Sequence, residues 1–110
     1  MAAPRAQPIH QDGQLIGHAI RCPACEAEDT GSLHVFYLKT TWSSPGWSFN
    51  GDVYKPTFIP SMMARCRLKG VEHVCHSFVT DGRIQYLGDC THALKGQTID
   101  LPPFDDKEEP

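Results

Sequence analysis

Arg21-Cys22-Pro23-Ala24-Cys25-Glu26 holds two thiols with two residues between them. Two cysteines at this spacing can bind one metal ion from a single tight turn. They can also close into a redox-active disulfide. The first arrangement predicts a small domain held together by a metal ion, and the second predicts an oxidoreductase. The other cysteines and histidines decide which prediction the sequence favours.

Stretches rich in β-forming side chains flank the cysteine pair. Leu15–Ile20 leads into it and Leu33–Leu38 follows it, which predicts a strand, a metal-binding turn and a second strand. The redox alternative expects a helix that begins at the cysteine pair, because the helix dipole lowers the thiol pKa. Asp29-Thr30-Gly31 follows soon after the pair, and no helical periodicity appears. The sequence therefore favours a metal site over redox chemistry.

A hairpin is predicted nearer the C-terminus. Val74–Thr80 and Arg83–Leu87 flank Asp81-Gly82, a dipeptide suited to a two-residue hairpin turn. Side chains alternate between the two faces of a strand. If the ladder continues outward from the turn, Cys75 faces Gly88, and Cys75 and Cys90 become diagonal neighbours on one face of the hairpin.

The turn and the hairpin together supply enough thiols for one tetrahedral structural zinc site. The two histidines next in order each lie within two positions of a hairpin cysteine and are alternative ligands. The predicted ligands are Cys22, Cys25, Cys75 and Cys90, with His76 and His92 as the alternatives. Cys66, between Arg65 and Arg67, is expected outside the site.

Length and composition predict one small β-rich domain. The chain has 110 residues, nine glycines and nine prolines, so many turns and little helix are expected. We predict a flexible arm over residues 1–13, a single zinc-ribbon-like domain of hairpins over 14–103 and an acidic tail over 104–110. The predicted core consists of Ile20, Val35, Phe36, Phe58, Val79, Ile84 and Tyr86.

Net charge and hydropathy limit where in the cell the protein is expected and which classes of partner it is expected to bind. The net charge of −3 argues against a broad grip on nucleic acid, which needs clustered Lys and Arg. No stretch approaches the roughly 20 apolar residues of a membrane span. The first eight residues lack the apolar segment of a secretory signal. The sequence thus predicts a cytoplasmic protein that binds no membrane.

Three stretches together resemble a family of short phage and prophage proteins that often carry the mistaken name "ammonia monooxygenase". They are Cys22–Cys25, then Trp47–Asp52 with Pro56–Ser61, and last Cys75–Val79 running to Asp89–Thr98. The resemblance covers roughly residues 20 to 102. It implies a phage origin, hence the cytoplasm of the host cell, and a compact metal-binding fold.

The remaining candidates concern binding. Trp42 and Trp47 flank a short loop and could anchor a partner, and the turn that holds Asn50 and Asp52 could line a polar pocket. Asp89-Cys90-Thr91-His92 is dense in polar groups, but metal ligation explains these atoms more simply than a nucleophile and base. No catalytic residue is therefore predicted.

The sequence predicts an accessory protein that binds a host or phage protein and has no catalytic activity. Two alternatives stay open. One is a small metalloenzyme or thiol oxidoreductase that uses an open zinc or the cysteine pair. The other is a single-stranded nucleic-acid binder that uses Trp42, Trp47, Arg65 and Arg67.

Overall fold

Two antiparallel sheets make up the protein in a computed structural model that describes residues 3–28, 30–38 and 46–104. The three-stranded sheet has the order β1-β2-β3 and the five-stranded sheet the order β4-β5-β6-β7-β8. The only helix among the described residues is one of five residues. The elements are β1 (Gln7–Gln11), β2 (Gln14–Arg21), α1 (Pro23–Ala27), β3 (Leu33–Tyr37), β4 (Ser48–Phe49), β5 (Phe58–Leu68), β6 (Val71–Thr80), β7 (Arg83–Tyr86) and β8 (Thr98–Asp100). The predicted β-rich class is confirmed.

Three tight turns join neighbouring strands. Asp12-Gly13, Lys69-Gly70 and Asp81-Gly82 all have positive φ at both positions, from 52° to 80°. Positive φ at both central residues twists a turn to match the twist of its strands. The turn at residues 81–82 is confirmed. The turn at residues 12–13 uses the same dipeptide and pairs β1 with β2, so a strand occupies residues 7–11 of the predicted flexible arm.

The register of the C-terminal hairpin follows the prediction close to its turn. Thr80 pairs with Arg83, Val79 with Ile84 and Ser77 with Tyr86. The ladder ends there, because residues 88–89 form a turn. The predicted pairing of Cys75 with Gly88 is therefore absent. After Tyr86, the turn at residues 88–89 takes the place of a continued strand, and the chain stays next to β6.

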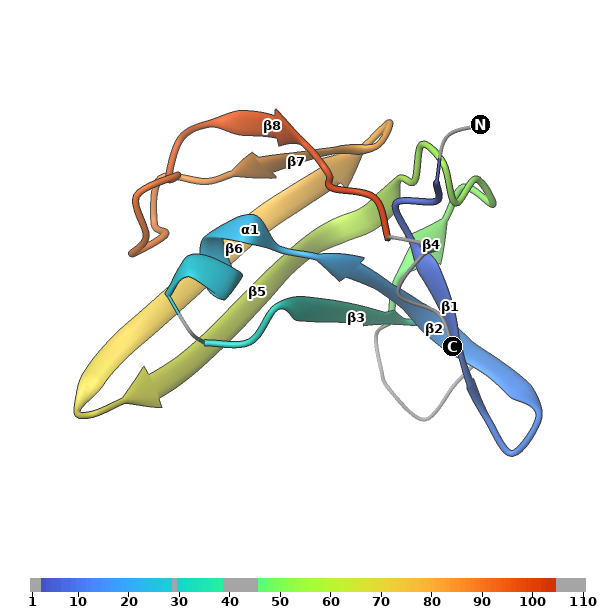
Figure 1. Ribbon diagram of the computed structural model, residues 1–110, viewed down its shortest axis with the longest axis horizontal. Coiled ribbons are helices and arrows are strands. Elements are labelled where there is room, and N and C mark those ends of the chain that lie inside the picture. The colour runs from blue at the N-terminus through green and yellow to red at the C-terminus, as the bar shows by residue number, and fades with distance from the viewer. Residues whose placement is uncertain (1–2, 29, 39–45, 105–110) are drawn as a thin grey trace.

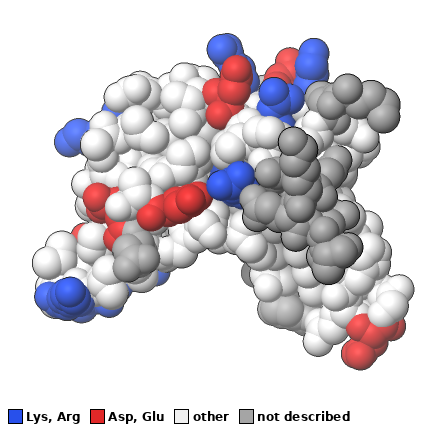
Figure 2. All heavy atoms as spheres, viewed as in Figure 1, with Lys and Arg blue, Asp and Glu red and all other residues white. Residues whose placement is uncertain are grey.

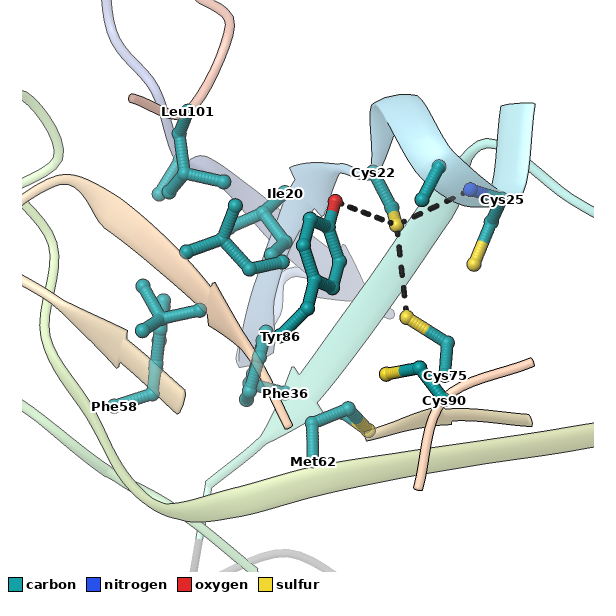
Figure 3. Close-up of a cluster of buried hydrophobic side chains, with 14 residues drawn as sticks. Ile20, Cys22, Cys25, Phe36, Phe58, Met62, Cys75, Tyr86, Cys90 and Leu101 are labelled. Carbon is teal, nitrogen blue, oxygen red and sulfur yellow. Dashed lines mark hydrogen bonds between the residues drawn. The ribbon is translucent and has the colours of Figure 1, made fainter. Parts of the chain in front are cut away.

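The two sheets pack together around one aromatic core (Figures 1 and 3). Phe58 of β5 stacks on Phe36 of β3 with ring centroids 4.2 Å apart, and Trp47 meets Phe36 edge-on at 5.5 Å. Leu101, after β8, is also fully buried. Of the predicted core, Ile20, Phe36, Phe58, Val79, Ile84 and Tyr86 are buried. Val35 is only half-buried, because it alternates with Phe36 along β3 and points away from the core.

β5 contains an irregularity that matters for the site. Phe58 pairs with Val79 and Met62 with Ser77, so three residues of β5 lie opposite one residue of β6. Ile59, Pro60 and Ser61 form this bulge, and the Ile59–Pro60 peptide bond is cis. Pro56 and Pro60 in the sequence favour an edge strand or an irregular loop over a central strand, and for Pro60 this prediction is wrong. Pro60 lies within β5, which pairs with β4 on one side and β6 on the other, and the bulge accommodates it. Bulges turn individual side chains out of the regular alternation of a strand.

Candidate functional site

Four buried side chains from three parts of the chain meet behind α1. Cys22, Cys25, His34 and Cys75 each offer one ligand atom, and these atoms lie within 4.8 Å of one another. Cys22 caps the helix, and its Sγ accepts a hydrogen bond from the Cys25 amide. The absence of a helix after the cysteine pair was predicted wrongly: Pro23 at the first helical position favours one short turn of helix.

The distances between these atoms suit a tetrahedral ion. The Sγ atoms of Cys22 and Cys75 lie 3.8 Å apart (Figure 3), and Cys25 Sγ lies 3.4 Å from His34 Nε2. Zinc bonds of about 2.3 Å to sulfur and about 2.0 Å to nitrogen separate two tetrahedral sulfur ligands by about 3.8 Å, and sulfur from nitrogen by about 3.5 Å. The four side chains therefore fit a metal ion, and they form a closed set of ligands.

The electrostatics of this cluster favour a cation. Hydrogen bonds from Cys25 and Cys75 hold the pKa of the Cys22 thiol below its ordinary value. The hydrogen bond to Cys22 raises the pKa of Cys75. Burial lowers the pKa of His34, but its contacts with the Cys22 and Cys25 thiols outweigh burial and raise it to about 9. The cluster thus stabilises negative charge on Cys22 and positive charge on His34, and a bound metal ion would supply further positive charge for thiolate ligands.

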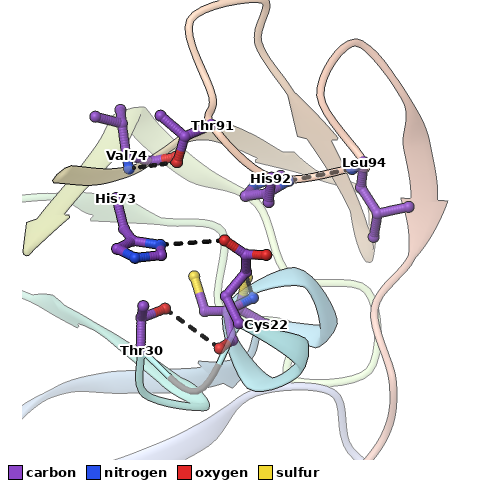
Figure 4. A network of polar contacts seen from close by, with 9 residues as sticks. Cys22, Thr30, His73, Val74, Thr91, His92 and Leu94 are labelled. Carbon is purple, nitrogen blue, oxygen red and sulfur yellow. Dashed lines mark hydrogen bonds and ion pairs between the residues drawn. The ribbon is translucent and has the colours of Figure 1, made fainter. Parts of the chain in front are cut away.

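A second group overlaps the first through Cys75. Cys75, Cys90 and His92 also lie within 4.8 Å of one another, and all are buried. His92 Nδ1 accepts a hydrogen bond from the Leu94 amide (Figure 4), while its buried Nε2 has no partner among the described residues. Burial lowers the pKa of His92. Next to both groups, α1, β3, β5 and β6 border an open pocket of about 100 Å³ that Cys25, His34 and His92 help to line.

The predicted ligands thus divide between three places. Cys22, Cys25 and Cys75 lie in the four-residue cluster, and Cys90 and His92 lie in the overlapping group. His76 lies outside both groups. Cys66 is exposed. His34 is not among the ligands predicted from the sequence. Its position in β3 could have indicated burial, because His34 lies two residues before the buried Phe36 on the same face and pairs with the buried Ile20.

His76 points to the opposite face of β6 and joins two other polar side chains. Its Nε2 lies 3.0 Å from Ser61 Oγ. Its Nδ1 lies 3.1 Å and 3.0 Å from the two carboxylate oxygens of Asp89. A serine, a histidine and an aspartate bonded in this order form the arrangement of a catalytic triad. The sequence suggests Ser61 only as part of a polar pocket with the turn at Asn50 and Asp52, and it does not join Ser61 to His76 and Asp89, which lie far from it along the chain.

Each triad residue is placed by local structure. Ser61 lies two residues before Met63 at the end of the bulge, so it shares the face of β5 that stands next to His76. Met63 and His76 are paired across β5 and β6, which fixes His76 beside the bulge. Asp89 sits in the turn that replaces the end of β7. About 22% of the His76 side chain and 52% of the Asp89 side chain are exposed, so the triad opens onto the surface.

The predicted binding residues have structural roles where the structure describes them. Trp47 is half-buried, packs on Phe36 and donates from Nε1 to the Ser61 carbonyl oxygen. Asn50 Oδ1 accepts from the Asp52 amide, and Asp52 Oδ1 accepts from the Tyr54 amide. These are the local bonds of turns. Trp42 lies outside the described residues.

Charged side chains are spread over the face in Figure 2, with blue and red atoms along its upper edge, across its middle and at its lower tips. Blue atoms cluster at the tip of the β5–β6 hairpin (lower left), where Arg65, Arg67 and Lys69 alternate with Cys66 and Leu68 in sequence. Arg65 lies 3.4 Å from Glu72 across the hairpin. No helix among the described residues is long and apolar enough to cross a membrane.

Comparison with known proteins gives one match. No curated protein and no solved structure matches the chain. A family profile described as "Bacterial ubiquitination-like system serine protease (BubE)" matches residues 3–87. These residues include the cysteine pair, His34, Cys75, Ser61 and His76. Since the match spans most of its 110 residues, the chain belongs to the bacterial ubiquitination-like system serine protease (BubE) family.

Proposed function

We propose that this chain is a serine hydrolase in which Ser61 is the nucleophile, His76 the general base and Asp89 the residue that orients the base. The contacts of His76 carry the proposal: one ring nitrogen lies 3.0 Å from the serine hydroxyl, and the other lies 3.0 Å from a carboxylate oxygen. The word "protease" in the family description supports the same assignment.

The protonation of His76 follows from its two neighbours. An ionised carboxylate can only accept hydrogen bonds, so Nδ1 carries the proton that is donated to Asp89. Nε2 then keeps its lone pair and accepts the hydroxyl proton of Ser61. This tautomer is the one that a general base requires.

Two transfers complete the proposed reaction. Ser61 Oγ bonds to the carbonyl carbon of the substrate while its proton passes to His76 Nε2. The imidazolium, stabilised by Asp89, returns that proton to the leaving group as the bond between the carbonyl carbon and the leaving group breaks. Water then attacks the acyl-enzyme, again through Nε2, and frees the Ser61 hydroxyl.

The surface around the triad supports a protein substrate. Ile59 in the bulge, Met63 opposite His76 and Phe78 two residues after it expose 62%, 39% and 41% of their surface. Exposed apolar side chains that gather around polar groups are typical of sites for protein segments. We therefore propose that the substrate is a protein of a ubiquitin-like modification system, cleaved at an ester or amide bond. The protein binding expected from the tryptophan loop would then occur at the triad.

The Cys/His cluster has a structural part in this proposal. Cys22, Cys25, His34 and Cys75 would hold one zinc ion, and a closed set of four ligands leaves no position for substrate. When bound, the ion supplies a positive charge and a crosslink between β6 and the β2–α1–β3 unit. The phage origin, the cytoplasmic location and the nucleic-acid and thiol-redox alternatives stay predictions.

Labelling with a fluorophosphonate probe tests the nucleophile, because such probes react with activated serines. We expect mass spectrometry of the labelled protein to place the adduct on Ser61, and we expect Ser61→Ala to abolish labelling. Ser48→Ala removes an exposed serine of β4 and serves as the matched control. An adduct on any other serine, or a wild-type protein that does not react, contradicts the proposal.

A further inference from the structure

The edge of β6 next to His76 is covered by a turn. Strand pairing between β6 and β7 ends at Ser77 and Tyr86. Beyond that point, the backbone groups of residues 74 and 76 are bonded by the segment that follows β7. Leu87 donates its amide to the His76 carbonyl oxygen, and the Thr91 amide donates to the Val74 carbonyl oxygen. Asp89 is carried by this segment.

Cys90 makes two contacts with the backbone of His76. The His76 amide donates to Cys90 Sγ at 3.2 Å, and the Cys90 thiol donates to the His76 carbonyl oxygen at 3.2 Å. Cys90 exposes only 4% of its surface, so water does not compete for these groups. One side chain thus contacts both backbone groups of His76, and it shares the carbonyl oxygen with the Leu87 amide.

The same contacts indicate that Cys90 is not one of the metal ligands. A thiol that binds a metal ion is deprotonated, and a thiolate has no proton for the His76 carbonyl oxygen. Cys22, Cys25, His34 and Cys75 already supply the four ligands of a tetrahedral ion. His92 Nδ1 accepts from the Leu94 amide, which leaves its proton on Nε2, where a metal ion would otherwise bind.

We propose that Cys90 is a positioning residue of the Ser61–His76–Asp89 triad and is not a metal ligand. This inference rests on the proposed function. Cys90 follows Asp89 directly in the chain and bonds the backbone of His76, so it fixes both ends of the Asp89–His76 hydrogen bond. Its thiol acts from the inner face of the sheet, while the imidazole acts on the outer face.

Thr91 offers a matched control. Its hydroxyl accepts from the Val74 amide at 2.9 Å and lies 3.4 Å from the Val74 carbonyl oxygen (Figure 4). These contacts resemble those of Cys90, but they are made to Val74, which lies two residues before His76 in β6 and is not part of the triad. Thr91→Val removes a side-chain bond to the same strand with a similar shape, and it leaves the backbone of His76 untouched.

The test compares Cys90→Ala, Cys90→Ser and Thr91→Val with the wild type. It measures bound zinc, hydrolysis of p-nitrophenyl acetate and the low-field proton resonance of the His76 Nδ1–H that is bonded to Asp89. Cys90→Ala should lower kcat by about 10- to 100-fold, because a displacement on the order of 1 Å in a catalytic group has that effect. KM and bound zinc should stay at wild-type values, and the resonance should shift or broaden.

Cys90→Ser should recover part of kcat, since a hydroxyl can both donate to and accept from the His76 backbone. Thr91→Val should keep both kcat and the resonance. Loss of zinc in Cys90→Ala or Cys90→Ser would show that Cys90 is a ligand and overturn the inference. An unchanged kcat with an unchanged resonance would overturn it as well. If Cys90→Ala does not fold, the same measurements of bound zinc, kcat and the resonance on Cys90→Ser test the inference.

The resonance separates this inference from the proposed function. If the wild-type protein hydrolyses no ester and takes no fluorophosphonate label, the proposed function fails. A resonance that changes in the Cys90 variants but not in Thr91→Val would then still show that Cys90 positions His76.

Discussion

His76 Nδ1 lies 3.0 Å from a carboxylate oxygen of Asp89, although strand pairing between their two segments ends before either residue. Their contact exists because residues 87–90 leave the β7 ladder and turn back over β6. Had the ladder continued in the same register, residue 89 would have paired with Val74 and stayed on the face of His76 as its diagonal neighbour. The turn instead brings the Asp89 carboxylate within hydrogen-bond distance of His76 Nδ1.

Asp89→Asn should lower kcat for ester hydrolysis by about 10³- to 10⁴-fold while the fold is kept, because an amide does not hold the imidazole in the required tautomer. Steady-state kinetics with p-nitrophenyl acetate measure the effect. Asp81→Asn, in the hairpin turn, is the control and should behave as wild type. A loss below about tenfold would show that Asp89 does not orient the base.

His34→Ala should remove bound zinc and destabilise the domain by about 3 kcal/mol or more, as expected for loss of a metal ligand. That loss corresponds to a fall in the melting temperature of roughly 12 °C or more. His34→Cys should retain zinc, because four thiolates also bind it. His73→Ala, a half-buried histidine that contacts Glu28, is the control. Full zinc content in His34→Ala would remove His34 from the site.

Tyr86→Phe should weaken zinc binding without abolishing it. The Tyr86 hydroxyl lies 3.3 Å from Cys22 Sγ in the buried core (Figure 3). Groups that hydrogen-bond a metal ligand typically change metal affinity by about 10- to 100-fold. Competition with a chelator of known affinity measures the change. Tyr54→Phe, at an exposed tyrosine, should leave the affinity unchanged. Equal affinities for all three proteins would contradict the expected contribution of the hydroxyl.

His18 should make the domain less stable in acid. Burial, together with the nearby charge of His10, lowers the pKa of His18 below its ordinary value of 6.5. Above about pH 6.5 the ring is neutral in the folded and the unfolded chain, so it contributes no pH dependence. Below that pH the unfolded chain binds a proton that the folded chain does not, and the free energy of unfolding decreases.

His18→Phe, which keeps an aromatic ring beside Phe49, should reduce this loss. Urea unfolding of both proteins between pH 7 and pH 5 gives the two slopes. Slopes that agree within error would assign the acid sensitivity to other groups.

Local signals in the sequence predict much of the fold. Asp81-Gly82 fixes the register near its turn, and the cysteine pair locates half of the metal cluster. The triad could not be predicted in this way. Ser61 and Asp89 share the face of His76 by ordinary alternation, but the bulge in β5 and the turn after β7 set how close their side chains come to the imidazole. Counting by two gives the face of each side chain, but it does not reveal the bulge or the turn, so it does not predict these contacts.

Cys75 and His76 are consecutive in β6 and serve opposite faces of the sheet, which has a consequence for inhibitor profiling. A chelator that strips a metal ion from the Cys/His cluster would disturb the strand that carries His76, the proposed general base. A serine-directed inhibitor would block the same protein from the other side. By the usual diagnostic reagents this chain should therefore register as both a metalloprotease and a serine protease. Only the position of the covalent adduct would tell the two classes apart.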